Sequence, residues 1–95
     1  MSVNVIVNLK SDPAKLAEFG DVIESVKTEL PKAEGFISVD IYRNKEDESE
    51  FTLVEAWESQ DHHANYIKSV AESGSWEELM TFLAGEPTRQ YYSQV

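Results

Sequence analysis

The stretch Phe51-Thr52-Leu53-Val54-Glu55-Ala56-Trp57-Glu58-Ser59 decides the fold of this chain. Successive side chains of a strand point to opposite faces, so Phe51, Leu53, Glu55 and Trp57 share one face. The strand ends at Ser59, a residue type that caps helices, and Asp61 suits the first turn of a helix that follows. The stretch therefore predicts a strand over residues 51–58 and then a helix that runs to about Ser73.

Upstream of this stretch the chain predicts a second strand and a hairpin. Residues 36–43 alternate, with Ile37, Val39 and Ile41 on one face and a more polar set on the other: Phe36, Ser38, Asp40 and Tyr42. The charged segment 44–50 connects two strand-like runs, which is typical of a β-hairpin.

The N-terminal third predicts a strand and one long helix. Residues 3–9 are rich in β-branched side chains and place Val3, Val5, Val7 and Leu9 on one face. Asp12 and Pro13 are a helix-start signal, and Pro31 marks the end of the helix. Between them an apolar stripe recurs at spacings of three and four residues: Leu16, Phe19, Ile23, Val26 and Leu30.

The C-terminal third predicts two helices and a closing strand. The helix after Ser59 has an inward face made of His63, Tyr66, Ile67 and Val70, and Gly74 breaks it. Ser75 and Glu78 have the spacing of a capping box for a short third helix, which Gly85 and Pro87 end. That helix carries Trp76, Leu79, Met80, Phe82 and Leu83. Residues 88–95, which include Tyr91 and Tyr92, predict the last strand.

The predicted order β-α-β-β-α-α-β defines a single α+β domain over residues 1–95. Apart from the extra short helix, it is the ferredoxin-like split β-α-β pattern, with helices on one face of an antiparallel sheet. Several strands carry apolar or aromatic side chains on both faces, so the second face also needs cover. We therefore expect a homodimer in which two sheets pack against each other.

Composition narrows the class of partner and the location. Acidic residues number 18 against 8 basic ones, and the net charge of −10 disfavours nucleic acid and anionic membranes as partners. The chain has no cysteine and no apolar run of the ~20 residues that span a bilayer. The segment from Met1 to Asn4 lacks the features of a signal peptide, so a cytoplasmic location is expected.

The motif Glu55-x-Trp57-x-Ser59, followed by Tyr66 seven residues after the serine, resembles the antibiotic biosynthesis monooxygenase (ABM) family. The segments Glu34-Gly35-Phe36 and Leu83–Pro87, and the Tyr91-Tyr92 pair, are also similar to one branch of it. The resemblance spans nearly the whole chain. It implies a dimeric α+β barrel in which each subunit holds a pocket between its sheet and its helices.

The resemblance also implies an activity. Some members oxidise polycyclic phenols or quinols with molecular oxygen and without metal, flavin or haem, because the electron-rich substrate itself reduces oxygen. We therefore expect a cofactor-independent monooxygenase acting on a small phenolic or quinol-like aromatic. Two positions depart from the family pattern: Tyr66 stands where a histidine is common, and Val70 stands near a position where an arginine is common.

Three residues are candidates for catalysis. Glu55 shares an apolar strand face, where a carboxylate without a partner is costly and its pKa rises, so it is a candidate base. His63 lies one helical turn from Tyr66; it is a second candidate proton acceptor, and Tyr66 is a candidate hydrogen-bond donor to a substrate oxygen. Each has a structural alternative: a buried, hydrogen-bonded carboxylate, histidine or tyrosine that only stabilises the core.

Three further residues are candidates for substrate binding. Trp57 offers an aromatic wall and an indole N–H, although a tryptophan that only packs in the core fits the pattern as well. Asn8 and Tyr42 are candidates for polar groups on the floor of the pocket.

Other functions remain open at this level. His62 and His63 are adjacent, so a helix points them about 100° apart and a shared metal ion is disfavoured. Asn8, Trp57 and His63 match in type the residues of haem-degrading relatives, which keeps haem as a minor alternative. A non-catalytic dimeric binding or stress-response module that uses the same pocket is the main alternative to an enzyme.

Overall fold

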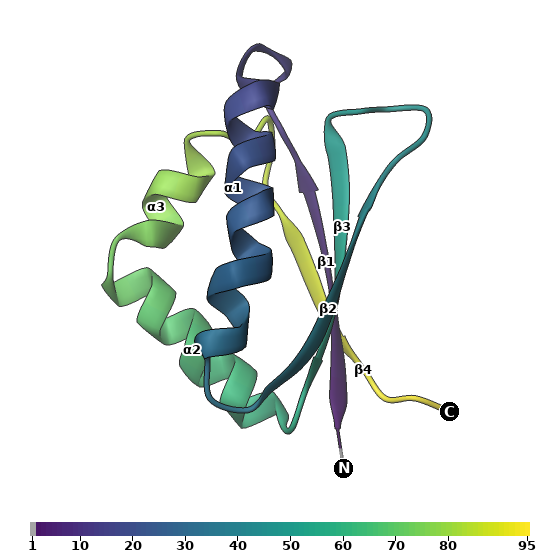
Figure 1. Ribbon diagram of the computed structural model, residues 1–95, viewed down its shortest axis with the longest axis vertical. Coiled ribbons are helices and arrows are strands. Elements are labelled where there is room, and N and C mark those ends of the chain that lie inside the picture. The colour runs from purple at the N-terminus through teal and green to yellow at the C-terminus, as the bar shows by residue number, and fades with distance from the viewer. Residues whose placement is uncertain (1) are drawn as a thin grey trace.

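The computed structural model describes residues 2–95, and it forms one sheet with the helices packed on a single face (Figure 1). In chain order the elements are β1 (Val3–Lys10), the 3-10 turn η1 (Pro13–Lys15), α1 (Leu16–Glu29), the 3-10 turn η2 (Leu30–Lys32), β2 (Phe36–Arg43), β3 (Glu50–Trp57), α2 (Gln60–Glu72), α3 (Ser75–Met80) and β4 (Thr88–Tyr92).

The four strands lie in the order β2-β3-β1-β4, and every neighbouring pair is antiparallel. This is the predicted ferredoxin-like arrangement, with α1 connecting β1 to β2 and α2 with α3 connecting β3 to β4. Val5 of β1 lies opposite Glu55 of β3 and opposite Tyr91 of β4. Since facing residues share a side of the sheet, this register brings Glu55 and Tyr91 to the face that the helices cover.

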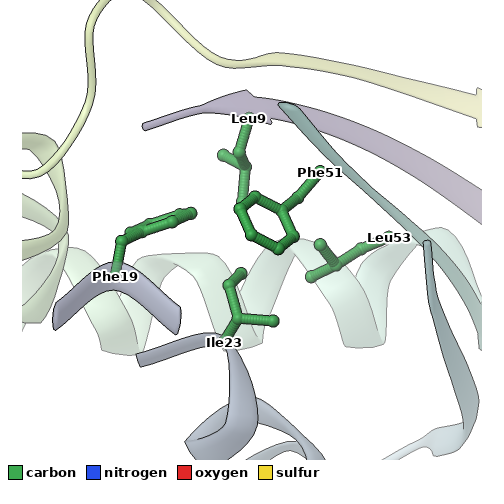
Figure 2. Close-up of a cluster of buried hydrophobic side chains, with 5 residues drawn as sticks. All are labelled: Leu9, Phe19, Ile23, Phe51 and Leu53. Carbon is green, nitrogen blue, oxygen red and sulfur yellow. The ribbon is translucent and has the colours of Figure 1, made fainter. Parts of the chain in front are cut away.

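The core forms where the apolar stripe of α1 meets the covered face of the sheet. Figure 2 shows Phe19 and Ile23 of α1 pointing toward Leu9, Phe51 and Leu53 of the strands, and all five side chains are buried. The rings of Phe19 and Phe51 meet edge to face at 5.4 Å. The predicted stripe of the first helix is therefore confirmed, and the sheet face is the one predicted from residues 51–57.

The predicted faces of β2 are wrong at its first two residues. A β-bulge shifts the register between Phe36 and Ser38, so Phe36 lies opposite Trp57 on the covered face. Ile37 is the extra residue, and its side chain is 51% exposed. The bulge is stabilised because it lets the rings of Phe36 and Trp57 meet edge to face at 5.6 Å.

The predicted start of the third helix is also corrected. Gly74, at φ +83°, is the N-cap of α3, and Ser75 is the first helical residue, so Ser75 and Glu78 form no capping box. The hydroxyl of Ser75 accepts a hydrogen bond from that of Ser73 instead. The helix ends at Met80, before Phe82 and Leu83, and β4 ends at Tyr92 rather than at the chain terminus.

The second face of the sheet carries no helix (Figure 1). Tyr42 is 59% exposed and Tyr92 is 46% exposed, and the central pair Ile6 and Val54 is half-buried. Within residues 2–95, no helix combines the length and the apolar character that a membrane crossing requires.

Candidate functional site

A buried carboxylate lies at the centre of the site. Glu55 is near the end of β3 and is only 5% exposed. Its Oε1 accepts a hydrogen bond of 2.8 Å from the indole Nε1 of Trp57, two residues along the same face of the strand. This charge-assisted bond fixes the carboxylate and stabilises its ionised form.

Trp57 is fully buried behind Glu55 and does not line the pocket described below. Its indole packs against His63 and Tyr66 of α2, each with ring centroids at 5.3 Å. The predicted aromatic wall therefore exists as packing between β3 and α2. Within the site, Trp57 positions Glu55 through its N–H.

His63 of α2 is 1% exposed and lies against the same carboxylate. Its Nδ1 is 2.8 Å from the hydroxyl of Tyr91 on β4, a hydrogen bond that orients the ring. Its Nε2 is 3.9 Å from Oε1 of Glu55, which is too long for a hydrogen bond. Ser59 caps α2 by accepting from the amide of His62, and this cap sets the rotation that turns His63 inward.

Burial shifts the pKa values of Glu55 and His63 in the direction that favours the uncharged form of each side chain. It raises the pKa of Glu55, against the opposing effects of the Trp57 hydrogen bond and the charge of Arg89. It lowers the pKa of His63 to about 4, with a further lowering from Arg89. His63 is therefore unprotonated at neutral pH, and a full ion pair with Glu55 is disfavoured despite their proximity.

Tyr66 keeps its hydroxyl proton. Burial raises its pKa, and the negative charges of Glu55 and Glu29 raise it further. The side chain therefore remains a hydrogen-bond donor at any physiological pH, as a contact to a substrate oxygen would require.

A pocket of about 370 Å³ opens between the sheet and the helices, and Glu55, His63 and Tyr66 all line it. Most of its remaining wall is aliphatic and comes from the sheet, through Val7 and Leu53, and from all three α-helices, through Val26, Ile67, Val70 and Leu79. An apolar wall with a few converging polar groups is the usual form of a small-molecule site. The structure thus brings the three candidate catalytic residues together in one cavity.

Asn8 and Tyr42 lie on the opposite face of the sheet. Asn8 is between Val7 and Leu9, so strand alternation turns it away from the helices, and its Oδ1 accepts a 2.7 Å hydrogen bond from Thr52. Tyr42 also faces Thr52 across the sheet. Neither residue lines the pocket, so their predicted place on its floor is wrong. The haem alternative needs Asn8, Trp57 and His63 in one site, and Asn8 lies on the other face of the sheet from the other two.

Two residues of the site escaped the sequence analysis. Arg89 lines the pocket, and Tyr91 holds His63; both come from β4. The alternation of a strand beginning at Thr88 puts Arg89 and Tyr91 on one face, so a signal was present. What the sequence does not reveal is that this face is the covered one, because the register to β1 decides it.

Metal-ligating side chains do not cluster in the part of the chain that the structure describes: residues 2–95 contain no group of three or more His, Cys, Asp or Glu that could hold an ion.

Comparison with known proteins assigns the family. The model of the antibiotic biosynthesis monooxygenase family matches residues 2–72, which include both β3 and α2. The chain therefore belongs to this family, and that membership supports a monooxygenase. No protein among the curated sequences matches it.

Solved structures share the fold along the whole chain. A conserved protein from Methanosarcina mazei Go1 has a TM-score of 0.86 and 23% identity, over 100% of this chain and 94% of that one. Rv0793 from Mycobacterium tuberculosis has a TM-score of 0.85 and 16% identity, over 100% and 96%. SnoaB, a cofactor-independent oxygenase from Streptomyces nogalater, has a TM-score of 0.81 and 13% identity, over 98% and 92%.

Proposed function

We propose that this protein is a cofactor-independent monooxygenase that oxidises a phenolic or quinol-like aromatic with molecular oxygen. The observation that carries the proposal is the carboxylate of Glu55 in the wall of an apolar pocket, held by Trp57 and faced by His63. SnoaB, which shares the fold, is a cofactor-independent oxygenase, and this supports the same class of chemistry here.

Glu55 is the proposed base. A carboxylate whose pKa is raised by burial is a stronger base than one in water, and the Trp57 hydrogen bond keeps it oriented. It takes the phenolic proton of the substrate, and the O–H of Tyr66 donates a hydrogen bond to the oxygen that becomes negative. His63 is unprotonated and lies beside Glu55, so it is the second acceptor in the pocket.

The deprotonated substrate is the reductant in this scheme. It passes an electron to oxygen, and recombination at the ring carbon forms a C–O bond to a peroxide anion, which takes back the proton held by Glu55 to become a hydroperoxide. Loss of the hydrogen on that carbon, with cleavage of the O–O bond, gives a quinone and one water, so a phenol and O₂ become a quinone and H₂O. The aliphatic wall excludes bulk water from these intermediates.

Oxygen consumption tests the proposal. A panel of hydroquinones and polycyclic phenols is expected to raise the rate of oxygen uptake above the buffer blank with wild-type protein. Glu55→Gln keeps the shape and an acceptor for Trp57 but removes the base, and kcat is expected to fall about 10²- to 10⁴-fold. Glu58 is an exposed carboxylate three residues further along the chain. Glu58→Gln is therefore the matched control and is expected to retain activity.

Two results would contradict this activity. One is uptake equal to the blank for wild type across the panel. The other is a Glu55→Gln rate equal to wild type, which would reduce Glu55 to a structural carboxylate.

A non-catalytic binding module is the second candidate. The pocket wall is mainly aliphatic, and such a wall binds an apolar ligand without needing to react with it. A ligand from the same panel that raises the melting temperature without oxygen uptake or product would favour this candidate over the monooxygenase.

We also propose that the protein is a homodimer and cytoplasmic. The uncovered sheet face with its exposed tyrosines supports the dimer, as does membership of a family that is generally dimeric. The absence of cysteine fits a reducing compartment.

A further inference from the structure

Arg89 is the one basic side chain among the residues that line the pocket, whose other polar groups are Glu55, His63 and Tyr66. It lies on β4 directly opposite Val7 of β1, and both residues line the pocket. The positive charge of Arg89 acts on the inner wall of the pocket, because it lowers the pKa of both Glu55 and His63. Arg89 is itself exposed, so it lies where the pocket meets solvent.

Among residues 2–95 this guanidinium has no ion-pair or side-chain hydrogen-bond partner, although acidic side chains are plentiful. Lys10, Lys27 and Lys32 pair with carboxylates at 3.2–3.3 Å, and Arg43 lies over the ring of Phe51. Within residues 2–95, no ion pair and no side-chain hydrogen bond occupies Arg89. The five N–H donors of the Arg89 guanidinium are therefore available to a ligand.

The two ends of the pocket favour different parts of a ligand. The inner wall is mainly aliphatic, and its polar groups are Glu55, unprotonated His63 and Tyr66. An apolar ring system fits there, whereas a second negative charge next to the Glu55 carboxylate does not. The mouth has an unpaired guanidinium, whose planar fork matches a carboxylate or phenolate oxygen better than a neutral group.

We propose that Arg89 is the specificity-determining residue of this pocket and selects ligands that join an apolar ring body to an anionic oxygen. This assignment rests on the proposed function, because it takes the pocket to be the ligand site. It narrows the substrate class from aromatics in general to those that carry a carboxylate or an ionised phenol beside the ring that reacts.

Two pairs of naphthalene probes, each with an anionic and a neutral member, test the assignment, and the members of the first pair are closely matched in size and shape. Calorimetric titration compares 2-naphthoate with 2-naphthamide, and 4-nitro-1-naphthol, which is ionised at neutral pH, with 1-naphthol, which is not. Wild type is compared with Arg89→Gln. Lys68→Gln, on the exposed side of α2, removes an equal charge away from the pocket and is the matched control.

Wild type and Lys68→Gln are expected to bind the anionic member of each pair roughly three- to tenfold more tightly, as befits a partly solvated ion pair. Arg89→Gln is expected to bind both members equally. Preference for only one kind of anion narrows the class to that anion and still supports the assignment.

Equal affinity of wild type for the charged and neutral probes would overturn the role of Arg89 and leave the proposed function standing. The same holds if Arg89→Gln keeps the full preference. Failure of wild type to bind any of the four probes would overturn both, because the cavity would then not be a site for aromatic ligands.

Discussion

Glu55 and His63 lie 3.9 Å apart in the interior, and burial moves their pKa values in opposite directions, each toward the neutral form. The ordinary reading of such a pair as a salt bridge does not fit this environment, because both ions lose more hydration than a 3.9 Å contact returns. A carboxylate whose pKa is raised by burial, beside an imidazole that stays unprotonated, is suited to accepting a proton from a bound substrate.

The low pKa of His63 makes stability depend on pH. The unfolded chain binds a proton near pH 6.5, whereas folded His63 does so only near pH 4. The contribution of neutral His63 is therefore complete above about pH 6.5 and is lost as the pH falls toward about 4. Urea unfolding is expected to show wild type losing on the order of 1 to 3 kcal/mol more than His63→Gln across this window.

The raised pKa of Glu55 has the opposite sign, because it stabilises the fold as the pH falls through its folded value. Glu55 is present in both wild type and His63→Gln. The difference between their pH profiles of unfolding free energy therefore reports on His63. Parallel pH profiles for wild type and His63→Gln would contradict the lowered pKa.

Tyr91 stabilises the site through one hydroxyl. Tyr91→Phe leaves the ring in place and removes the partner of His63 Nδ1, so a buried polar atom loses its hydrogen bond. The free energy of unfolding is expected to fall by about 1–3 kcal/mol in urea titrations. Tyr92→Phe removes a hydroxyl from the uncovered face of the same strand and is expected to change stability by less than about 0.5 kcal/mol; equal losses in the two variants would contradict this role.

At the scale of secondary-structure elements, the faces of β1 and β3 and the stripe of α1 could be predicted because period 2 and period 3.6 run through them without interruption. Asn8 was placed wrongly although its own strand pattern, between Val7 and Leu9, puts it on the other face. The bulge at Ile37 could not be predicted, since Phe36 is drawn inward by Trp57, a residue 21 positions along the chain. Arg89 and Tyr91 were missed because a register between strands is a tertiary property.

The turn that leads into β2 depends on Gly35. This residue has φ +83°, and a Cβ built there would lie 2.3 Å from the ring of His62, which Ser59 holds by a hydrogen bond. Gly35→Ala is therefore expected to cost about 1–3 kcal/mol of unfolding free energy and to lower the melting temperature.

Gly20→Ala is the matched control for Gly35→Ala. Gly20 is inside α1, and a Cβ there meets nothing within 4 Å, so helix propensity alone acts and stability is expected to rise by up to about 1 kcal/mol. A neutral or stabilising Gly35→Ala would show that the turn and the His62 ring relax at no cost.

At the scale of the whole molecule, the helices form one layer on one side of the sheet. The two faces of the sheet therefore differ in what covers them. The covered face holds the core and the pocket, with Glu55, His63 and Arg89 on or beside it. The uncovered face has half-buried Ile6 and Val54 at its centre and exposed Tyr42 and Tyr92 on its two edge strands. Apolar and aromatic groups spread over a broad flat surface are typical of an interface between copies.

The proposed dimer follows from that division, and its test uses a charge at the centre of the uncovered face. Wild type is expected to sediment at twice the chain mass of 10.8 kDa at micromolar concentration. Val54→Lys would bury an unpaired ammonium between the two sheets, and it is expected to shift the mass to one chain, whereas Ala64→Lys on the exposed side of α2 is expected to leave the dimer intact. A monomeric wild type, or a Val54→Lys variant that stays dimeric, would refute pairing through this face; in the second case the pocket side of the molecule, with Arg89 at its mouth, would become the surface to examine for the interface.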